Sequence, residues 1–229
     1  FNYAGAVPAP TNAVAMVYSP AYGALAIRNS ASAVIAIDLL TGDTSTRYAN
    51  VGFTDIALAP SGRYVFAADY GGENIGAPLN TSHVHRLDLA TMTWESRIAH
   101  IAGRVQSVSD TQVILSSMDQ WVTFTNNLWG SDPALAIVNT PSGSPWYPGY
   151  YATVYFGNFR YDPSTQRLIH GNSGLSSQEI QAFRMVGYDF VRQEGSGVYG
   201  SAQGYGGSVV LATGASAFYY GRLQVDALD

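Results

Sequence analysis

The sequence predicts an all-β fold, and three observations support this prediction. Charged residues make up only 12% of the 229 residues, while aromatic residues make up 13% and glycine occurs 24 times. Short apolar runs alternate with Pro/Gly turns, as in "ALAPSGRYVFAADYGG" at residues 57–72. The same order of runs and turns returns along the chain, which indicates a repeat architecture. This composition is typical of short strands and tight turns rather than of helices with charged faces.

Two segments, 14–48 and 55–97, carry the clearest copies of the repeat. In each, an apolar strand ends in a Pro/Gly turn, and a second apolar strand ends in a polar loop. The third strand reads "VIAIDLLTG" in one copy and "HVHRLDLATM" in the other, and a polar fourth strand follows. Asp38 and Asp88 stand just before turns, where a short carboxylate can accept backbone N–H groups. We therefore expect both aspartates to form turns.

Three weaker copies follow the first two. The third copy has a first hairpin at residues 104–117 and a third strand at 134–143. The fourth copy consists of 159–174 and 179–187, and the fifth of 202–214 and 221–228. The first strands start near residues 14, 55, 104, 157 and 202, a mean spacing of about 47 residues with four strands per unit. This period is typical of a propeller blade rather than of a helical solenoid.

The last copy ends without a fourth strand, and residues 1–10 resemble 46–52, which is a fourth strand leading into a new unit. Ring closure by the N-terminal strand would remove the open sheet edges. We expect one β-propeller domain over residues 1–229, with five four-stranded blades. The predicted blades cover 14–52, 55–101, 104–149, 157–198, and 199–229 together with 1–10. The alternative is a fragment of a larger propeller that is completed by further domains or a second chain.

The stretches "APSGRYVFAADYGG" and "VHRLDLATMTW" resemble the repeats of YVTN-type and quinoprotein-like β-propellers. The resemblance is strong in the first two copies and looser in the rest of the chain. It implies a fold and not an activity, because such propellers include lactonases, lyases, dehydrogenases and adhesive modules.

Composition also excludes several classes of protein. The net charge is −5, and the 11 basic residues are all arginines that form no stripe, which argues against nucleic-acid binding. No apolar run approaches the roughly 20 residues of a membrane span. Cysteine is absent, which excludes thiolate metal sites and thiol nucleophiles. The chain begins at Phe1, as a processed exported protein would, so we expect a secreted or cell-surface location, with the periplasm as a further option.

The candidate binding site comes from the long connections between second and third strands, at 68–82 and 117–133, and from the linker 142–157. Connections of this length are often functional. Aromatic rings with nearby amides and carboxylates suit a sugar ligand, although the same rings can simply wedge blades together. The candidate ligand-binding residues are Asp69, Tyr70, Glu73, Asn74, Asp119, Trp121, Trp129, Trp146, Tyr147 and Asn172.

Catalytic groups are few. The predicted innermost strands carry almost no carboxylates except Asp55, which disfavours a glycosidase with two opposed acids. The "HVH" motif places His83 and His85 on one strand face, where they could share a metal, and His170 is a candidate general base. Asp69, Glu73 and Asn74 are also candidate ligands of a calcium ion, but no calcium-binding loop motif is present.

Three functions remain open from the sequence. The first is a non-catalytic extracellular binding or adhesion module that recognises a glycan or a protein partner through the aromatic-rich loop face. The second is a lactonase-like hydrolase or lyase that uses a metal or His170 near the channel mouth, together with Asp69, Glu73 and Asn172. The third is a structural domain of a larger surface protein. No cofactor is expected in the first and third cases, apart from calcium as an option.

Overall fold

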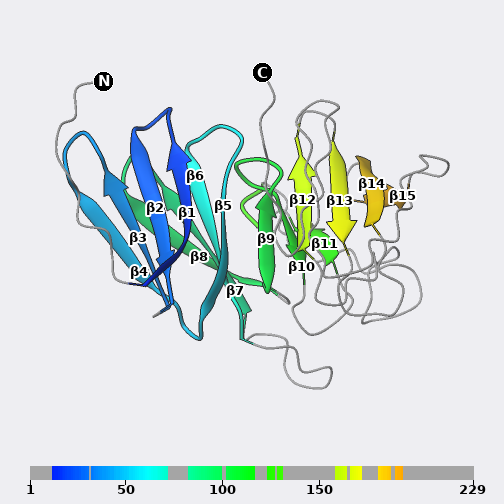
Figure 1. The fold of residues 1–229 in the computed structure, drawn as a ribbon, viewed down its shortest axis with the longest axis horizontal. Helices are drawn as coiled ribbons and strands as arrows, with labels where there is room; N and C mark the ends of the chain where they lie inside the picture. The colour runs from blue at the N-terminus through cyan, green and yellow to red at the C-terminus, as the bar shows by residue number, and fades with distance from the viewer. Residues whose placement is uncertain are drawn as a thin grey trace. The chain divides into compact units, whose positions relative to one another are not determined.

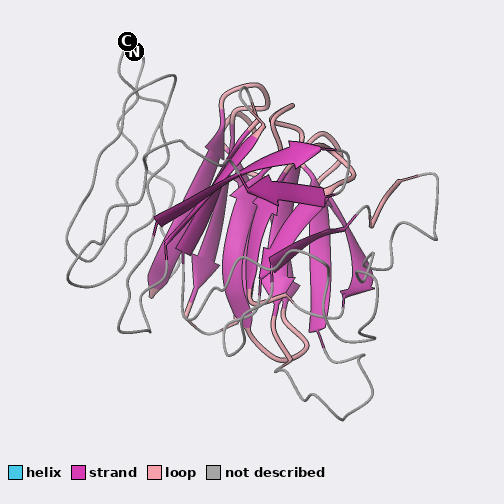
Figure 2. Ribbon diagram, turned by 90° about the vertical axis from the view of Figure 1, so that its right-hand side faces the viewer, coloured by secondary structure: helices cyan, strands magenta, loops and turns pink. Residues whose placement is uncertain are grey.

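The computed structural model describes residues 12–30, 32–71, 82–99, 102–116, 123–126, 128–130, 158–163, 166–171, 180–186 and 189–192. In these ranges the chain forms fifteen strands and no helix (Figure 2). The strands are β1 (Ala13–Ser19), β2 (Ala24–Asn29), β3 (Ala33–Asp38), β4 (Thr44–Tyr48), β5 (Phe53–Leu58), β6 (Tyr64–Asp69), β7 (Ser82–Asp88), β8 (Thr93–Ala99), β9 (Arg104–Ser107), β10 (Val113–Ser116), β11 (Thr123–Asn126), β12 (Asn158–Asp162), β13 (Arg167–Gly171), β14 (Ile180–Val186) and β15 (Asp189–Arg192).

Three four-stranded sheets have the same topology. Their strand orders are β1-β2-β3-β4, β5-β6-β7-β8 and β12-β13-β14-β15, and every neighbouring pair is antiparallel (Figure 1). Each sheet is thus a meander whose strands follow one another along the chain. The predicted first, second and fourth copies of the repeat are confirmed as four-stranded units. The five-blade count and the closing strand stay predictions, since residues 1–10 and 199–229 lie outside the described residues.

The third copy differs from the prediction. Its first hairpin is present as β9 and β10, but the segment 117–133, predicted as a loop, contains strand β11. β11 pairs antiparallel with β10, from Val113↔Asn126 to Ser116↔Thr123. The sequence "TFTN" supplies β-branched and aromatic residues that favour a strand, although it is too short to stand out among its polar neighbours. The predicted third strand at 134–143 lies outside the described residues.

The chain divides into two compact units. The first contains residues 1–72 and 78–110, and the second contains 73–77 and 111–229. In the first unit, β5 lies between β1 and β9, so the first strands of successive repeats are neighbours. Across the described ranges, no helix has the length and apolarity needed to cross a membrane.

The core of the first unit lies between its two four-stranded sheets. The sheet β1–β4 contributes mainly small side chains, including Ala24, Ala26 and Ala36. The sheet β5–β8 contributes larger ones, including Phe53 and Leu87, the latter 0% exposed. Small residues opposite large ones let the two sheets approach closely and interdigitate, which gives the dense packing that protein interiors require.

The turn aspartates behave as the sequence predicts. Asp38 Oδ1 accepts hydrogen bonds from the backbone N–H of Leu40 (2.7 Å) and Thr41 (3.1 Å), and these bonds lower the pKa of Asp38. Asp88 accepts the N–H of Ala90 (2.9 Å) in the equivalent turn. Asp88 is also paired with Arg63, whose hydrogen bond is the main reason that the pKa of Asp88 is lowered.

The hairpin turns of the two sheets also contact each other. Ser19 Oγ donates to the carbonyl of Gly62 at 2.6 Å. Gly62 has φ = 75°, and a Cβ at this position would lie 3.1 Å from Ser19 Oγ and 3.2 Å from Ala21 Cβ. Glycine is therefore required twice at residue 62, for the left-handed backbone and for the close approach of the turns.

One face of the first sheet carries an exposed apolar row on β1. Met16 and Tyr18 alternate along the strand and therefore point to the same side, and Val14 precedes them at an irregularity in the pairing with β2. Their side chains are 52%, 64% and 50% exposed. The opposite face of this sheet is the one that supplies the core of the first unit.

Replacing Leu87 with alanine is expected to lower the free energy of unfolding by about 3 kcal/mol, because the fully buried side chain leaves a cavity between the two sheets. Urea denaturation measures this change. Leu40→Ala is the matched control, since Leu40 is 86% exposed and should change stability by less than about 0.5 kcal/mol. Equal effects of the two substitutions would contradict the assigned core.

Candidate functional site

Asp69 is the buried end of strand β6. Its carboxylate is 0% exposed and accepts three backbone hydrogen bonds, from the N–H of Asn50 (2.6 Å), Val51 (3.0 Å) and Gly52 (2.9 Å). These three residues belong to the linker that leaves β4 and enters β5. One side chain therefore holds the connection between the first sheet and the second.

His85 on β7 is the fourth donor to this carboxylate. Its Nε2 lies 3.1 Å from Asp69 Oδ2, and its Nδ1 lies 2.7 Å from Ser96 Oγ on β8. Arg47 Nε on β4 also donates to Nδ1, at 3.2 Å. A guanidinium has no acceptor, so Nδ1 must accept and the ring proton resides on Nε2. His85 is therefore a neutral imidazole that donates to Asp69.

We call this set the Asp69 knot: Asp69, His85, Ser96, Arg47 and the backbone of residues 50–52. Arg47 also donates to Ser96 Oγ at 3.1 Å. The knot joins strands of both sheets of the first unit, β4 from one and β6, β7 and β8 from the other. A second contact also joins the two sheets. Ser45 Oγ on β4 donates to the carbonyl of Met92, just before β8 (2.8 Å), and accepts from Nε1 of Trp94 on β8 (3.0 Å).

The electrostatics of the knot favour an ionised Asp69. Burial alone would raise the pKa of this carboxyl, but the hydrogen bonds from His85 and from the amides of Asn50, Gly52 and Val51 outweigh it. They lower the pKa of Asp69 to about 2. The carboxylate is thus charged, buried and fully surrounded by donors.

The order Ser96–His85–Asp69 matches the order of a hydrolase triad, but its surroundings do not suit nucleophilic catalysis. His85 is 0% exposed, and its Nδ1 lone pair is shared between Ser96 and Arg47. A general base needs that lone pair for the proton of the nucleophile. Ser96 also lies within strand β8 and not at a sharp turn. The arrangement therefore holds the linker between β4 and β5, and His85 has no free lone pair with which to act as a general base.

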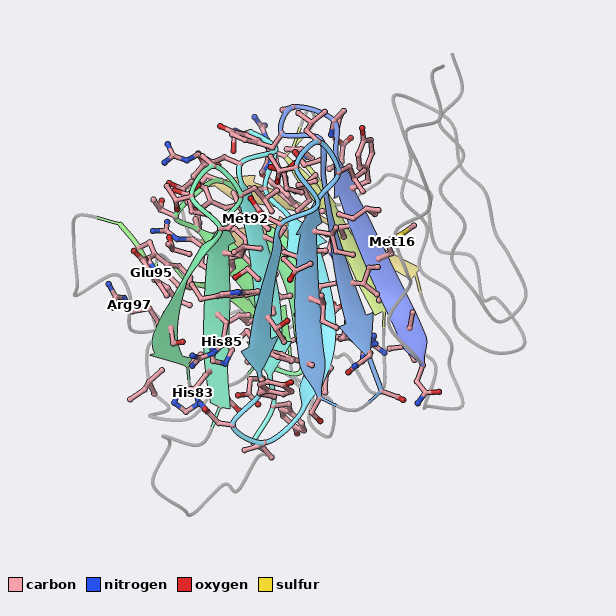
Figure 3. All side chains as sticks on the ribbon, turned by 90° about the vertical axis from the view of Figure 1, so that its left-hand side faces the viewer. Met16, His83, His85, Met92, Glu95 and Arg97 are labelled. Atoms are coloured by element: carbon pink, nitrogen blue, oxygen red, sulfur yellow. The ribbon has the colours of Figure 1, made fainter. Side chains whose placement is uncertain are left out.

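The "HVH" pair does not form the metal site considered from the sequence. The rings of His83 and His85 are stacked with centroids 6.1 Å apart, which confirms that they share one strand face (Figure 3). Both nitrogens of His85 are already hydrogen-bonded, so the pair cannot chelate an ion. Among the described residues, no group of three or more His, Cys, Asp or Glu side chains could hold a metal.

The predicted ligand-binding residues fall into three groups. Asp69 is wholly buried in the knot, which corrects the expectation that its carboxylate faces a ligand. Tyr70 follows it, is half-buried and donates its backbone N–H to the carbonyl of Gly52 at 3.0 Å. Trp129, in the second unit, is half-buried and donates its backbone N–H to Thr111 at 3.2 Å. The other predicted residues lie outside the described residues: Glu73, Asn74, Asp119, Trp121, Trp146, Tyr147 and Asn172.

His170 lies on β13, where it is paired with Phe159 and Gln181. His100 lies outside the described residues. The general-base role considered for His170 stays a prediction.

Sequence reasoning missed an exposed group beside the knot. Tyr48, Asn50 and Val51 lie at the end of β4 and in the linker that Asp69 holds, and all three side chains are exposed, Tyr48 by 71% and Val51 by 59%. We call these three residues the linker surface. The signal was present in "TSTRYANVG" (44–52), where alternation in a polar edge strand leaves Tyr48 on the outward side.

Comparison with known proteins identifies the fold. The chain is similar to a WD40 domain of coronin from Toxoplasma gondii (11% identity, TM-score 0.54, covering 79% of this chain and 44% of that one). It is similar to the Dos1 propeller (16%, TM-score 0.50, 78% and 46%) and to an auxiliary nutrient binding protein from Bacteroides ovatus (12%, TM-score 0.50, 77% and 39%). The chain has a β-propeller fold, and it spans less than half the length of these three structures.

No family model matches the chain, and no curated protein matches it in sequence. The likeness to solved structures at this level of identity establishes the fold alone.

Replacing Asp69 with asparagine is expected to lower the free energy of unfolding by about 3 kcal/mol or more. The substitution removes a buried charge and leaves donors facing an amide N–H₂ group. Urea denaturation measures the change. Asp43→Asn is the control because Asp43 is exposed, and a comparable loss in both variants would contradict the role of the knot.

The contribution of Asp69 to stability should depend on pH. Its pKa in the folded protein is about 2, below the ordinary value of 3.8, so its contribution is complete above about pH 4 and is lost as the pH falls toward about 2. The difference in unfolding free energy between the wild type and Asp69→Asn should therefore shrink over this interval. A difference that stays constant down to pH 2 would contradict an ionised, hydrogen-bonded Asp69.

Proposed function

We propose that this β-propeller is a non-catalytic binding module that recognises a protein partner or a glycan. The single observation that carries the proposal is the Asp69 knot. In the knot, the side chains of Asp69 and His85 are taken up by structural hydrogen bonds. Three of these bonds fix the backbone of residues 50–52, which includes Asn50 and Val51 of the linker surface. Because a preordered surface loses little conformational entropy on binding, such a surface suits recognition.

The linker surface has the chemistry of a recognition site. The ring of Tyr48 can stack on a sugar or pack against an apolar side chain, and the amide of Asn50 can bond to hydroxyl or backbone groups. Next to it, Tyr70 leads into the connection that carries Glu73 and Asn74, two of the predicted ligand-binding residues. The proposed site is the linker surface, with Tyr70 held beside it through its backbone N–H bond to the carbonyl of Gly52.

Two further elements belong to the proposal. The first is a secreted or cell-surface location, with adhesion as the biological role. The second is membership of the YVTN-type and quinoprotein-like propellers, which the repeats at 59–72 and 84–94 support. One similar structure is described as a nutrient binding protein, which is compatible with a ligand-binding role on this fold. The alternative is a lactonase-like hydrolase or lyase that uses a metal or His170. It is less favoured because Asp69, one of its residues, is wholly buried and hydrogen-bonded.

Replacing Tyr48 with alanine is expected to weaken ligand binding about tenfold, because the exposed ring is lost. A glycan array followed by affinity measurement on the positive glycans tests the glycan class. Partner capture with mass spectrometry tests the protein class. Tyr18→Ala is the matched control. Tyr18 is also an exposed tyrosine of the first sheet, but it lies at the opposite end of the strands, next to the β1–β2 turn.

The same experiment includes Trp121→Ala and Trp129→Ala, which probe the predicted aromatic loop face. A ligand that is retained by Tyr18→Ala and lost by Tyr48→Ala supports the linker surface. A ligand lost only by the tryptophan variants moves the site to the aromatic loops. Binding that is unchanged in all four variants contradicts both locations.

A further inference from the structure

Three charged side chains gather where the first strands of the repeats begin. Arg28, near the end of β2, donates from Nη1 to the carbonyl of Phe53 at 3.0 Å. Asp55 on β5 accepts the backbone N–H of Ile56 at Oδ1 (3.0 Å) and that of Val105 at Oδ2 (3.1 Å). Arg104 directly precedes Val105, at the start of β9. The three residues therefore come from β2, β5 and β9 of one compact unit.

This cluster is positively charged in a chain of net charge −5. Two guanidiniums and one carboxylate leave a charge of +1. Burial lowers the pKa of Arg28; the charge of Asp55 raises it and the charge of Arg104 lowers it again. Arg104 thus adds to the positive charge around Arg28, and Asp55 opposes it.

Both arginines have unused donors. Nε of Arg28 is buried without a hydrogen-bond partner. Arg104 is half-buried, and its side chain makes no ion pair or hydrogen bond within the part of the chain that the structure describes. Three other arginines of the same unit are engaged: Arg63 with Asp88, Arg86 with Glu95, and Arg47 with His85 and Ser96. A fourth, Arg97, is exposed to water and so needs no partner. Unpaired, partly buried guanidiniums are costly, and a bound anion would relieve the cost.

We propose that Arg104, with Arg28 behind it, binds a carboxylate group of the ligand. A guanidinium presents two parallel N–H bonds that fit the two oxygens of a carboxylate, and a net charge of +1 matches one monoanion. The carboxylate can come from a uronic acid of a glycan or from an acidic side chain of a protein. The inference rests on the proposed binding function and names the chemistry of its ligand.

The site belongs to the same end of the first unit as the linker surface. Phe53, whose carbonyl accepts from Arg28, directly follows the linker residue Gly52 that Asp69 holds. β5 begins at this point, and β9 lies beside it. The linker surface and Arg104 therefore lie at the same end of the first unit.

Titration calorimetry of the purified protein tests the proposal with four probes: sodium glucuronate, glucose, N-acetyl-aspartate α-amide, which carries a single carboxylate, and inorganic phosphate. We expect both carboxylates to bind and glucose not to bind. Tighter binding of glucuronate indicates a glycan source, and tighter binding of N-acetyl-aspartate α-amide indicates a peptide source. Binding of phosphate without either carboxylate, or binding of glucose equal to glucuronate, would overturn the proposal.

The variant Arg104→Gln should weaken carboxylate binding at least tenfold, whereas Arg97→Gln should not change it. Arg97 is a matched control because it is an exposed arginine of the same unit, on the edge strand β8 (Figure 3). Arg104→Lys keeps the charge but loses the two-pronged geometry, so it should give an intermediate loss and serves if the glutamine variant does not fold. Equal binding by the wild type and both Arg104 variants would overturn the proposal.

The result can be separated from that of the proposed function. Carboxylate binding that depends on Arg104 supports the anion site even if no macromolecular ligand depends on Tyr48. Conversely, the binding of a ligand could depend on Tyr48 and be unaffected by Arg104 substitution and by added glucuronate. That result would support the proposed binding function and contradict the proposed carboxylate site.

Discussion

The first unit of this protein depends on one buried carboxylate. Asp69 takes part in four hydrogen bonds, three from the backbone of the linker between β4 and β5 and one from His85. A buried charge is tolerated only where donors replace the water that it has lost. The carboxylate therefore requires the linker to follow one path, and that path sets how the second sheet follows the first. Small residues of the first sheet and large residues of the second then form the core between the two sheets.

The first two sheets were predictable because their signals are local. Apolar alternation marks the strands, and Asp38 and Asp88 bond to amides two or three residues away, so a short window of sequence contains the whole motif. Strand β11 was missed for the opposite reason. Four residues within a polar and aromatic segment give no clear period, and the strand is defined by its pairing with β10.

The role of Asp69 was not predictable from its neighbours. An aspartate at the end of a strand looks the same in the sequence whether it faces solvent or the interior. What decides is its partners, which lie 17 to 19 residues away in the linker and 16 residues away at His85. The bonds of His85 to Arg47 and of Arg47 to Ser96 span 38 and 49 residues. Asp69 is therefore a structural residue, and the linker residues that it holds add an exposed surface that the sequence did not predict.

The exposed row of Val14, Met16 and Tyr18 has a practical consequence for anyone who handles this protein. These apolar side chains face water on one strand, and the core of the first unit lies on the other side of the sheet. An exposed apolar row favours self-association as the protein concentration rises. Solubility, and not melting temperature, would then be the property that limits the use of the protein.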